Sequence, residues 1–137
     1  MGSNYIMYRG NYFNMVREFH ETYGLVVNDE PFERYEPIPA DLWMLRHKLH
    51  REEFDELIDA MTACDTVEIA DAICDLIYVL CGTAVSFGIP LNDCFDEVQR
   101  SNMSKLMPDG SVHRREDGKI LKGPNFTPPD LKSIIYG

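Results

Sequence analysis

The chain has little positive charge. Its 137 residues include 13 lysines and arginines against 23 aspartates and glutamates, for a formal net charge of -10. A nucleic-acid backbone requires basic patches, so this balance argues against nucleic acid as a partner. Residues 1–107 hold 8 basic and 19 acidic residues, whereas residues 108–137 hold 5 and 4. We therefore expect a phosphate-bearing ligand to need a bridging cation, or contacts from the C-terminal segment.

Other features are absent as well. The four cysteines form no CxxC pair, and no histidine stands at zinc-finger spacing from them, which favours free thiols in a reducing compartment. The N-terminus lacks the apolar run of a signal peptide. The longest apolar stretch, "DLIYVLCGTAVSFGI", is too short and too closely bordered by charge to span a membrane. We therefore expect a cytoplasmic protein with no membrane partner.

Helical patterns follow one another along the chain, with no internal repeat and no convincing period-2 strand. They predict helices over residues 9–23, from an N-cap at Asp41 to about Met61, over about 66–87 and over about 92–106. Short connections between them predict an all-α fold, an antiparallel bundle of about four helices. We expect a single domain over residues 1–137, with a core of about 10–106. The tail, 107–137, is expected to be irregular, although its two Asp-Gly turns allow a small hairpin.

Acidic residues crowd the second predicted helix at "REEFDELIDA", residues 51–60. On a helical wheel, Glu53 and Glu56 fall within about 40° of the apolar position Leu49, so they continue the core-facing stripe. Glu52 lies at the edge of that stripe. The remaining acids of the segment point elsewhere, toward water; they are Asp55 and Asp59. Like charges at this spacing repel one another, so the crowding requires a reason.

The third predicted helix, "TVEIADAICDLIYVLCGTAVSF", repeats the pattern, because Glu68, Asp71 and Asp75 fall within about 60° of one another. Apolar residues fill the rest of its surface, so we expect this helix to be buried and its acids to face the interior. A buried carboxylate costs on the order of several kcal/mol unless it is paired or binds a metal. Mg²⁺ and Mn²⁺ prefer carboxylate oxygens, so the two acidic lines predict a divalent metal site. Helix capping by Asp65 with Glu68 is a structural alternative for part of the pattern.

The two motifs, ExxE over residues 53–56 and ExxD over residues 68–71, resemble the signature of the all-α NTP pyrophosphohydrolase superfamily. That superfamily includes MazG proteins, dimeric dUTPases and phosphoribosyl-ATP pyrophosphohydrolases. The resemblance covers roughly residues 10–126. It is closest to the phosphoribosyl-ATP pyrophosphohydrolase-like, MazG-like branch, as in "FDEVQRSNMSKL" and "GKILKGPNF". The eleven residues between Glu56 and Glu68 form a spacer at the short end for the superfamily.

The resemblance implies hydrolysis of a nucleoside triphosphate to the monophosphate and diphosphate, by attack on the α-phosphorus. It implies two or more Mg²⁺ or Mn²⁺ ions per site, with ligands Glu53, Glu56, Glu68 and Asp71. Glu52 is expected to be the general base that takes a proton from the attacking water. Asp75 is expected to be an additional ligand or a supporting group. The expected substrate contacts are Asn102, Lys105, Lys119 and Lys122, with a solvated basic tail as the alternative for the last two.

Three functions stay open at this point. The first is hydrolysis of a (d)NTP of the nucleotide pool, and the second is hydrolysis of phosphoribosyl-ATP in histidine biosynthesis, with the same metal chemistry. The third is a non-catalytic helical dimerisation module that retains a metal site, against which the presence of Glu52 argues. The many apolar helix faces and the resemblance both predict a homodimer or homotetramer.

Overall fold

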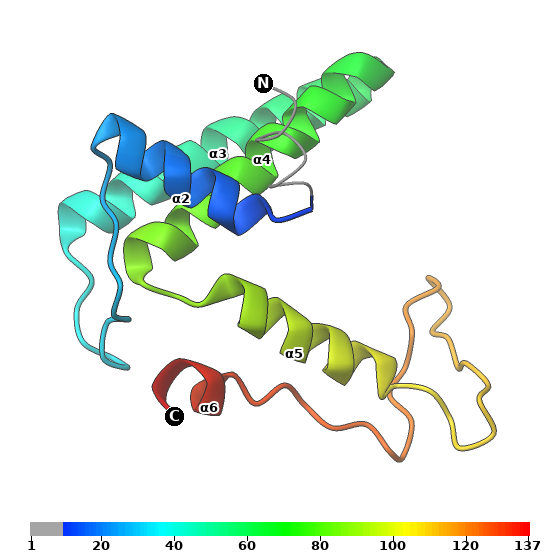
Figure 1. The fold of residues 1–137 in the computed structure, drawn as a ribbon. Helices are drawn as coiled ribbons and strands as arrows, with labels where there is room; N and C mark the ends of the chain where they lie inside the picture. The colour runs from blue at the N-terminus through cyan, green and yellow to red at the C-terminus, as the bar shows by residue number, and fades with distance from the viewer. Residues whose placement is uncertain (1–9) are drawn as a thin grey trace. The chain divides into compact units, whose positions relative to one another are not determined.

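The computed structural model describes residues 10–137, and this part of the chain contains five helices and no strand (Figure 1). Four helices are long, as expected, so the prediction of an all-α fold is confirmed. In chain order the helices are α2 (Tyr12–Tyr23), α3 (Ala40–Thr62), α4 (Thr66–Phe87), α5 (Leu91–Met103) and α6 (Leu131–Tyr136). In the segment with the two Asp-Gly turns, the hairpin is reduced to one isolated antiparallel bridge between Arg114 and Ile120.

The chain forms two compact units that meet at Ile89 and Pro90. The first contains α2, α3 and α4, and the second contains α5, α6 and the extended segment between them. Within the second unit α6 packs against α5, so the tail ends in a helix instead of being irregular throughout. The expected boundary between core and tail, near residue 106, therefore does not coincide with the boundary between the units. The single domain over 1–137 stays a prediction.

Capping residues explain the helix ends that were predicted well. The Asn11 side chain accepts a hydrogen bond from the Asn14 backbone N–H at 3.2 Å and begins α2; residue 9 of the expected helix lies outside the described residues. Gly24 ends α2 in the left-handed conformation, with φ of 68°. The Asp65 carboxylate accepts hydrogen bonds from the backbone N–H groups of Val67 and Glu68 at 3.1 and 3.2 Å and caps α4.

Two predicted boundaries differ from the structure. Pro39 stands at the N-cap of α3 without a side-chain hydrogen bond, and Asp41 lies in the first turn instead, where its charge still favours the helix dipole. Helix α5 ends at Met103 rather than near residue 106. The cause lies at Ser104, whose hydroxyl donates to the Ser101 carbonyl at 2.6 Å and accepts from the Thr127 N–H at 3.0 Å. The chain leaves the helix where the C-terminal segment is attached.

Helix α4 is the central helix of the first unit, because it packs against both α2 and α3 (Figure 1). The helix has 22 residues, and an 18-residue window of it has a mean hydropathy of 1.6, so by length and composition alone it is long and apolar enough to cross a membrane. The sequence-based expectation that no segment could span a membrane considered only the shorter stretch "DLIYVLCGTAVSFGI" and not the whole of α4. Packing on two sides, together with three acids along its length, is nevertheless typical of the core helix of a soluble protein.

One side of α4 is only partly covered by the described residues, 10–137. Ile73, Ile77 and Leu80 share this side and are 43%, 37% and 49% exposed. The expectation that α4 is buried around most of its surface is therefore wrong for the single chain. The three exposed residues, named here the α4 apolar face, lie away from the acidic line of the same helix.

Side chains of α2 and α3 pack directly against Gly82 of α4. A Cβ atom on Gly82 would lie 2.9 Å from His20 Nε2 and closer still to Nη2 of Arg46. His20 is only 3% exposed, and its Nδ1 lies 3.0 Å from the Val26 carbonyl oxygen, so it is a core histidine with a hydrogen-bond partner. The position therefore accepts no side chain.

We expect Gly82→Ala to lower the free energy of unfolding by about 1–3 kcal/mol, the usual cost of overpacking. Alanine raises helix propensity by about 1 kcal/mol, but neither the buried His20 ring nor the hydrogen-bonded Arg46 can withdraw. Urea denaturation measures the difference. Cys74→Ala, at an exposed position of the same helix, is the control and should change the value by less than about 0.5 kcal/mol. A Gly82→Ala variant more stable than the wild type would contradict the close approach.

Candidate metal centre

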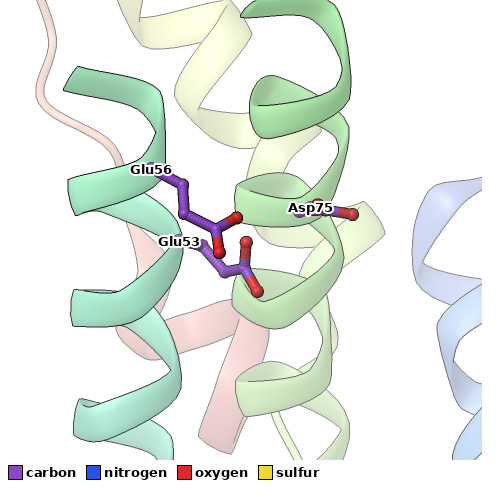
Figure 2. A group of neighbouring side chains, drawn as sticks. All are labelled: Glu53, Glu56 and Asp75. Atoms are coloured by element: carbon purple, nitrogen blue, oxygen red, sulfur yellow. The ribbon is translucent and has the colours of Figure 1, made fainter. Parts of the chain in front are cut away.

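The α3–α4 hairpin brings carboxylates from two helices together. The chain reverses at residues 63–65, and Glu53 and Asp75 each lie eleven positions from Cys64 in the turn, so an antiparallel hairpin places them side by side. Figure 2 shows Glu53 and Glu56 projecting from α3 toward α4, which carries Asp75. One oxygen from each of these three residues lies within 4.8 Å of the others. We call Glu53, Glu56 and Asp75 the carboxylate cluster.

Glu53 is the most constrained member of the carboxylate cluster. Its side chain is half-buried, and its Oε2 atom is buried without a hydrogen-bond partner among the described residues. Burial is the main cause that raises the pKa of Glu53, followed by the charges of Glu56 and Asp75. An orphaned buried oxygen is uncommon in proteins and indicates a missing partner such as an ion.

Asp75 is also half-buried, and burial followed by the charges of Asp71 and Glu56 raises its pKa. No basic side chain in residues 10–137 forms an ion pair with any member of the carboxylate cluster. Three carboxylates thus share a small space without a protein cation to compensate them. A bound cation would relieve both the burial and the mutual repulsion.

The carboxylate cluster fits a hard divalent cation. All its donors are carboxylate oxygens, which Mg²⁺ and Mn²⁺ prefer over nitrogen or sulfur. Two ligands on opposite sides of Mg²⁺ lie about 4.2 Å apart, since each is about 2.1 Å from the ion. The limit of 4.8 Å between the cluster oxygens therefore requires only a small adjustment of the side chains.

A cleft of about 420 Å³ lies toward the α3–α4 turn from the carboxylate cluster and shares Glu56 with it. Five acids and three alanines line it: Glu56, Asp59, Asp65, Glu68, Asp71, Ala60, Ala63 and Ala72. The small alanine side chains leave the space, and the acids make it strongly negative. Negative potential in a cleft attracts cations, and anions can enter only together with them.

The comparison with known families supports the same chemistry. The model of the family described as phosphoribosyl-ATP pyrophosphohydrolase matches residues 16–102, which is more than half of the chain and includes both acidic helices. The chain belongs to the phosphoribosyl-ATP pyrophosphohydrolase family. This family is part of the all-α, MazG-like NTP pyrophosphohydrolase superfamily, so the resemblance expected from the two motifs is confirmed. It identifies a pyrophosphohydrolase and suggests dependence on a divalent metal. The search of curated proteins gave no match.

The predicted ligands of the pyrophosphohydrolase divide between two places. Glu53 and Glu56 belong to the carboxylate cluster, together with Asp75, the residue predicted to be an additional ligand or a supporting group. Glu68 and Asp71 line the cleft and are exposed, so the expectation that they face a closed interior does not hold. Their roles as metal ligands stay predictions. Glu56 is the residue common to both places.

Asp59 is a residue of the cleft that was expected to point into water. It stands three positions after Glu56, which places the two acids one turn apart on neighbouring parts of the helix surface. That spacing was the signal in the sequence. Asp65 has two roles in the structure: it caps α4, and it lines the cleft.

Glu52, the predicted general base, is exposed and sits beside Glu53 on α3. Its nearest charged partner is Lys48, one turn earlier, with the two charged atoms 3.9 Å apart. An exposed ion pair at this distance holds a side chain weakly, so Glu52 is free to reorient. Its catalytic role in the pyrophosphohydrolase stays a prediction.

The expected substrate contacts all belong to the second unit of the pyrophosphohydrolase. Asn102 and Lys119 are exposed, and Lys105 is half-buried. The Lys122 ammonium lies 4.7 Å from the centre of the Phe126 ring, in cation–π contact. These four residues stay predicted substrate contacts.

We expect the metal-free pyrophosphohydrolase to lose stability as pH rises through the raised pKa values of Glu53 and Asp75. Raised pKa values of Glu53 and Asp75 mean that the folded state holds protons that the unfolded state releases. Stability therefore falls with pH in the window between the ordinary carboxyl pKa and the raised ones. Melting temperatures in chelator should fall less steeply with pH in Glu53→Gln. Glu18→Gln, an exposed change of equal charge on α2, should keep the wild-type slope. Equal slopes in the wild type and Glu53→Gln would contradict the burial of this charge.

Proposed function

We propose that the protein is a Mg²⁺- or Mn²⁺-dependent nucleoside triphosphate pyrophosphohydrolase that converts a (d)NTP and water to the (d)NMP and diphosphate. The observation that carries the proposal is the carboxylate cluster, with an orphaned buried oxygen, on the two acidic helices of a chain in a pyrophosphohydrolase family. We place the activity in the cytoplasm, on the free nucleotide pool.

The acids suit two ion positions that share Glu56. One position is the carboxylate cluster itself, and the other is the cleft, where Glu68 and Asp71 accompany Glu56. This division accommodates all four predicted ligands and adds Asp75. Divalent ions, when bound, neutralise charge on phosphate oxygens and lower the barrier to in-line displacement at phosphorus.

The chain's own residues supply the remaining steps. Glu52 takes a proton from a water molecule, which attacks the α-phosphorus as the bond to the bridging oxygen of the diphosphate breaks. Its exposed carboxylate beside Glu53 allows it to meet solvent water. Asn102, Lys105, Lys119 and Lys122 contact the substrate, the lysines as donors to phosphate oxygens.

Phosphoribosyl-ATP is the second candidate substrate, and the description of the matching family model favours it. Both substrates are cleaved between the α- and β-phosphorus, so the metal centre and Glu52 would have the same roles. The two candidates differ in what must be recognised beyond the phosphates.

A panel of NTPs, dNTPs and phosphoribosyl-ATP, with products resolved by chromatography, tests the proposal. We expect diphosphate and a monophosphate from at least one triphosphate in the presence of Mg²⁺ or Mn²⁺, and none after chelation. Glu53→Gln should abolish turnover and weaken ion binding, because it removes a ligand charge. Release of inorganic phosphate, or full activity in Glu53→Gln, would contradict the assignment; turnover of phosphoribosyl-ATP alone would favour the second candidate.

We expect Glu52→Gln to lower kcat by about 10²–10⁴, the usual contribution of a general acid or base. It should leave the affinity for Mn²⁺ and for a non-hydrolysable triphosphate within about twofold of the wild type, because no ligand is removed. Single-turnover rates and calorimetry measure the two effects separately. A parallel loss of affinity would show that Glu52 is a ligand rather than the base.

We also propose that the protein works as a homodimer or homotetramer. Support comes from the α4 apolar face, since three large aliphatic side chains on one helix side are an uncommon surface for a monomer.

Light scattering should therefore give an oligomer at micromolar concentration, and Ile77→Lys should shift it toward the monomer by placing a charge in the interface. Val67→Lys is the control, because Val67 is 75% exposed on another side of α4 and should leave the mass unchanged. A fully active wild-type monomer would refute the proposal.

A further inference from the structure

Arg46 of α3 is buried between helices, with only 5% of its surface exposed. None of the ion pairs among residues 10–137 involves it. Its guanidinium instead donates hydrogen bonds to α4: Nε to Thr83 Oγ1 at 3.0 Å, and Nη2 to the Val79 carbonyl oxygen at 2.6 Å. Burial lowers the pKa of Arg46, as expected for a cation without a counter-charge.

A buried arginine without a carboxylate partner needs an explanation. Arginine is almost never fully buried unless it is paired, because its charge loses hydration. Apolar residues of similar volume would commonly fill such a position at lower cost. Acids are abundant on the same two helices, yet Arg46 contacts a hydroxyl and a main-chain carbonyl of α4 instead. Both hydrogen bonds of the guanidinium therefore join α3 to α4.

His50 takes part in the same contact. Its Nε2 lies 2.6 Å from Thr83 Oγ1, and Thr83 Oγ1 donates to the Val79 carbonyl at 3.1 Å. With the single proton of Thr83 directed to Val79, Arg46 Nε donates to the Thr83 oxygen, and the His50 tautomer that completes this network carries its proton on Nε2. Arg46 and His50 of α3 and Thr83 and Val79 of α4 thus form one hydrogen-bonded group, which we call the cross-link between the two helices.

The cross-link adjoins the carboxylate cluster on both helices. His50 lies one turn before Glu53 on α3, and Val79 lies one turn after Asp75 on α4. The carboxylates of Glu53 and Asp75 repel each other across the same pair of helices when no cation separates them. The repulsion acts to separate α3 from α4, and the adjoining hydrogen bonds oppose it. Gly82 makes this possible, because any side chain there would occupy the place of the guanidinium.

We propose that Arg46 is a positioning residue, which holds α3 and α4 at the separation at which Glu53, Glu56 and Asp75 can bind one divalent ion. The inference rests on the proposed function, because it presupposes the metal centre. The cross-link preorganises the metal centre. Without it, the carboxylates of the empty cluster move apart, and binding of the ion must bring them together again. Residues that orient metal ligands typically contribute 10–100-fold to metal affinity.

Mn²⁺ affinity of the folded, substrate-free protein is the decisive measurement, by calorimetry well below the melting temperature of each variant. We expect Arg46→Met to bind Mn²⁺ at least about tenfold more weakly than the wild type. Arg51→Met is the matched control, since Arg51 is an exposed arginine of the same helix, 3.7 Å from Asp55. It should stay within about twofold. A purely structural role of Arg46 would lower the melting temperature and leave the Mn²⁺ affinity unchanged, which would overturn the proposal.

A reference variant separates this inference from the proposed function. Glu53→Gln removes a cluster carboxylate and must weaken Mn²⁺ binding if the metal centre exists. Unchanged binding in Glu53→Gln refutes the metal centre itself. Weakened binding in Glu53→Gln with wild-type affinity in Arg46→Met refutes only the role of Arg46.

A second pair of variants covers the case in which Arg46→Met does not fold. Thr83→Val removes the shared acceptor at nearly constant volume, whereas Thr83→Ser keeps the hydroxyl. We expect Thr83→Val to weaken Mn²⁺ binding several-fold and Thr83→Ser to retain most of the affinity. Wild-type affinity in either folded variant that loses the cross-link, Arg46→Met or Thr83→Val, overturns the proposal.

Discussion

Repulsion between carboxylates across the α3–α4 pair is the constraint on which the rest of the first unit depends. Glu53 and Glu56 approach Asp75 from the opposite helix, and no protein cation in the described residues compensates them. The orphaned oxygen of Glu53 and the raised pKa values follow from this arrangement. Such a cluster lowers the stability of the metal-free protein and favours the binding of a cation.

The surroundings of the carboxylate cluster follow a consistent pattern along the α3–α4 pair. Toward the turn the helices carry acids and alanines, which leave an open negative cleft. On the other side of the cluster they carry Arg46, His50 and Thr83, which join the helices by hydrogen bonds. Gly82 leaves the space that the side chains of His20 from α2 and Arg46 from α3 occupy. The open, acidic end and the hydrogen-bonded end of the helix pair therefore lie on either side of the candidate metal centre.

In the second unit, the charged pair of Arg100 and Glu97 on α5 binds the C-terminal segment. Arg100 donates to Glu97 at 2.5 Å, and the Asp130 N–H donates to the same carboxylate at 2.7 Å, so the pKa of Glu97 is lowered to about 2. Arg100 also donates to Thr127 Oγ1 at 2.6 Å, which attaches the C-terminal segment to α5. These bonds fix the course of a segment whose lysines are the expected phosphate contacts.

Local sequence was enough for the helices and for the existence of an acidic site. Hydrophobic periodicity located four long helices, because helical phase depends on neighbours only a few residues apart. The two acidic motifs, ExxE and ExxD, were visible for the same reason, although a metal site shared by their four acids stays a prediction. The early end of α5 was not predicted, because it depends on the contact of Ser104 with Thr127, far along the chain. Helix α6 was missed although its N-cap is local, with Asp130 accepting a hydrogen bond from the Ser133 N–H.

Tertiary structure alone decided which carboxylates meet. The wheel of each helix gives directions but not the register between helices, and that register follows from where the chain turns at Cys64. It brings Asp75 to Glu53 and leaves Glu68 and Asp71 along the cleft. It also decided that Arg46, at the margin of an apolar stripe, is buried against Thr83 while Ile77 on the far side of α4 is exposed. Burial is a property of the assembled helices, and a single helix carries no record of which neighbour will cover it.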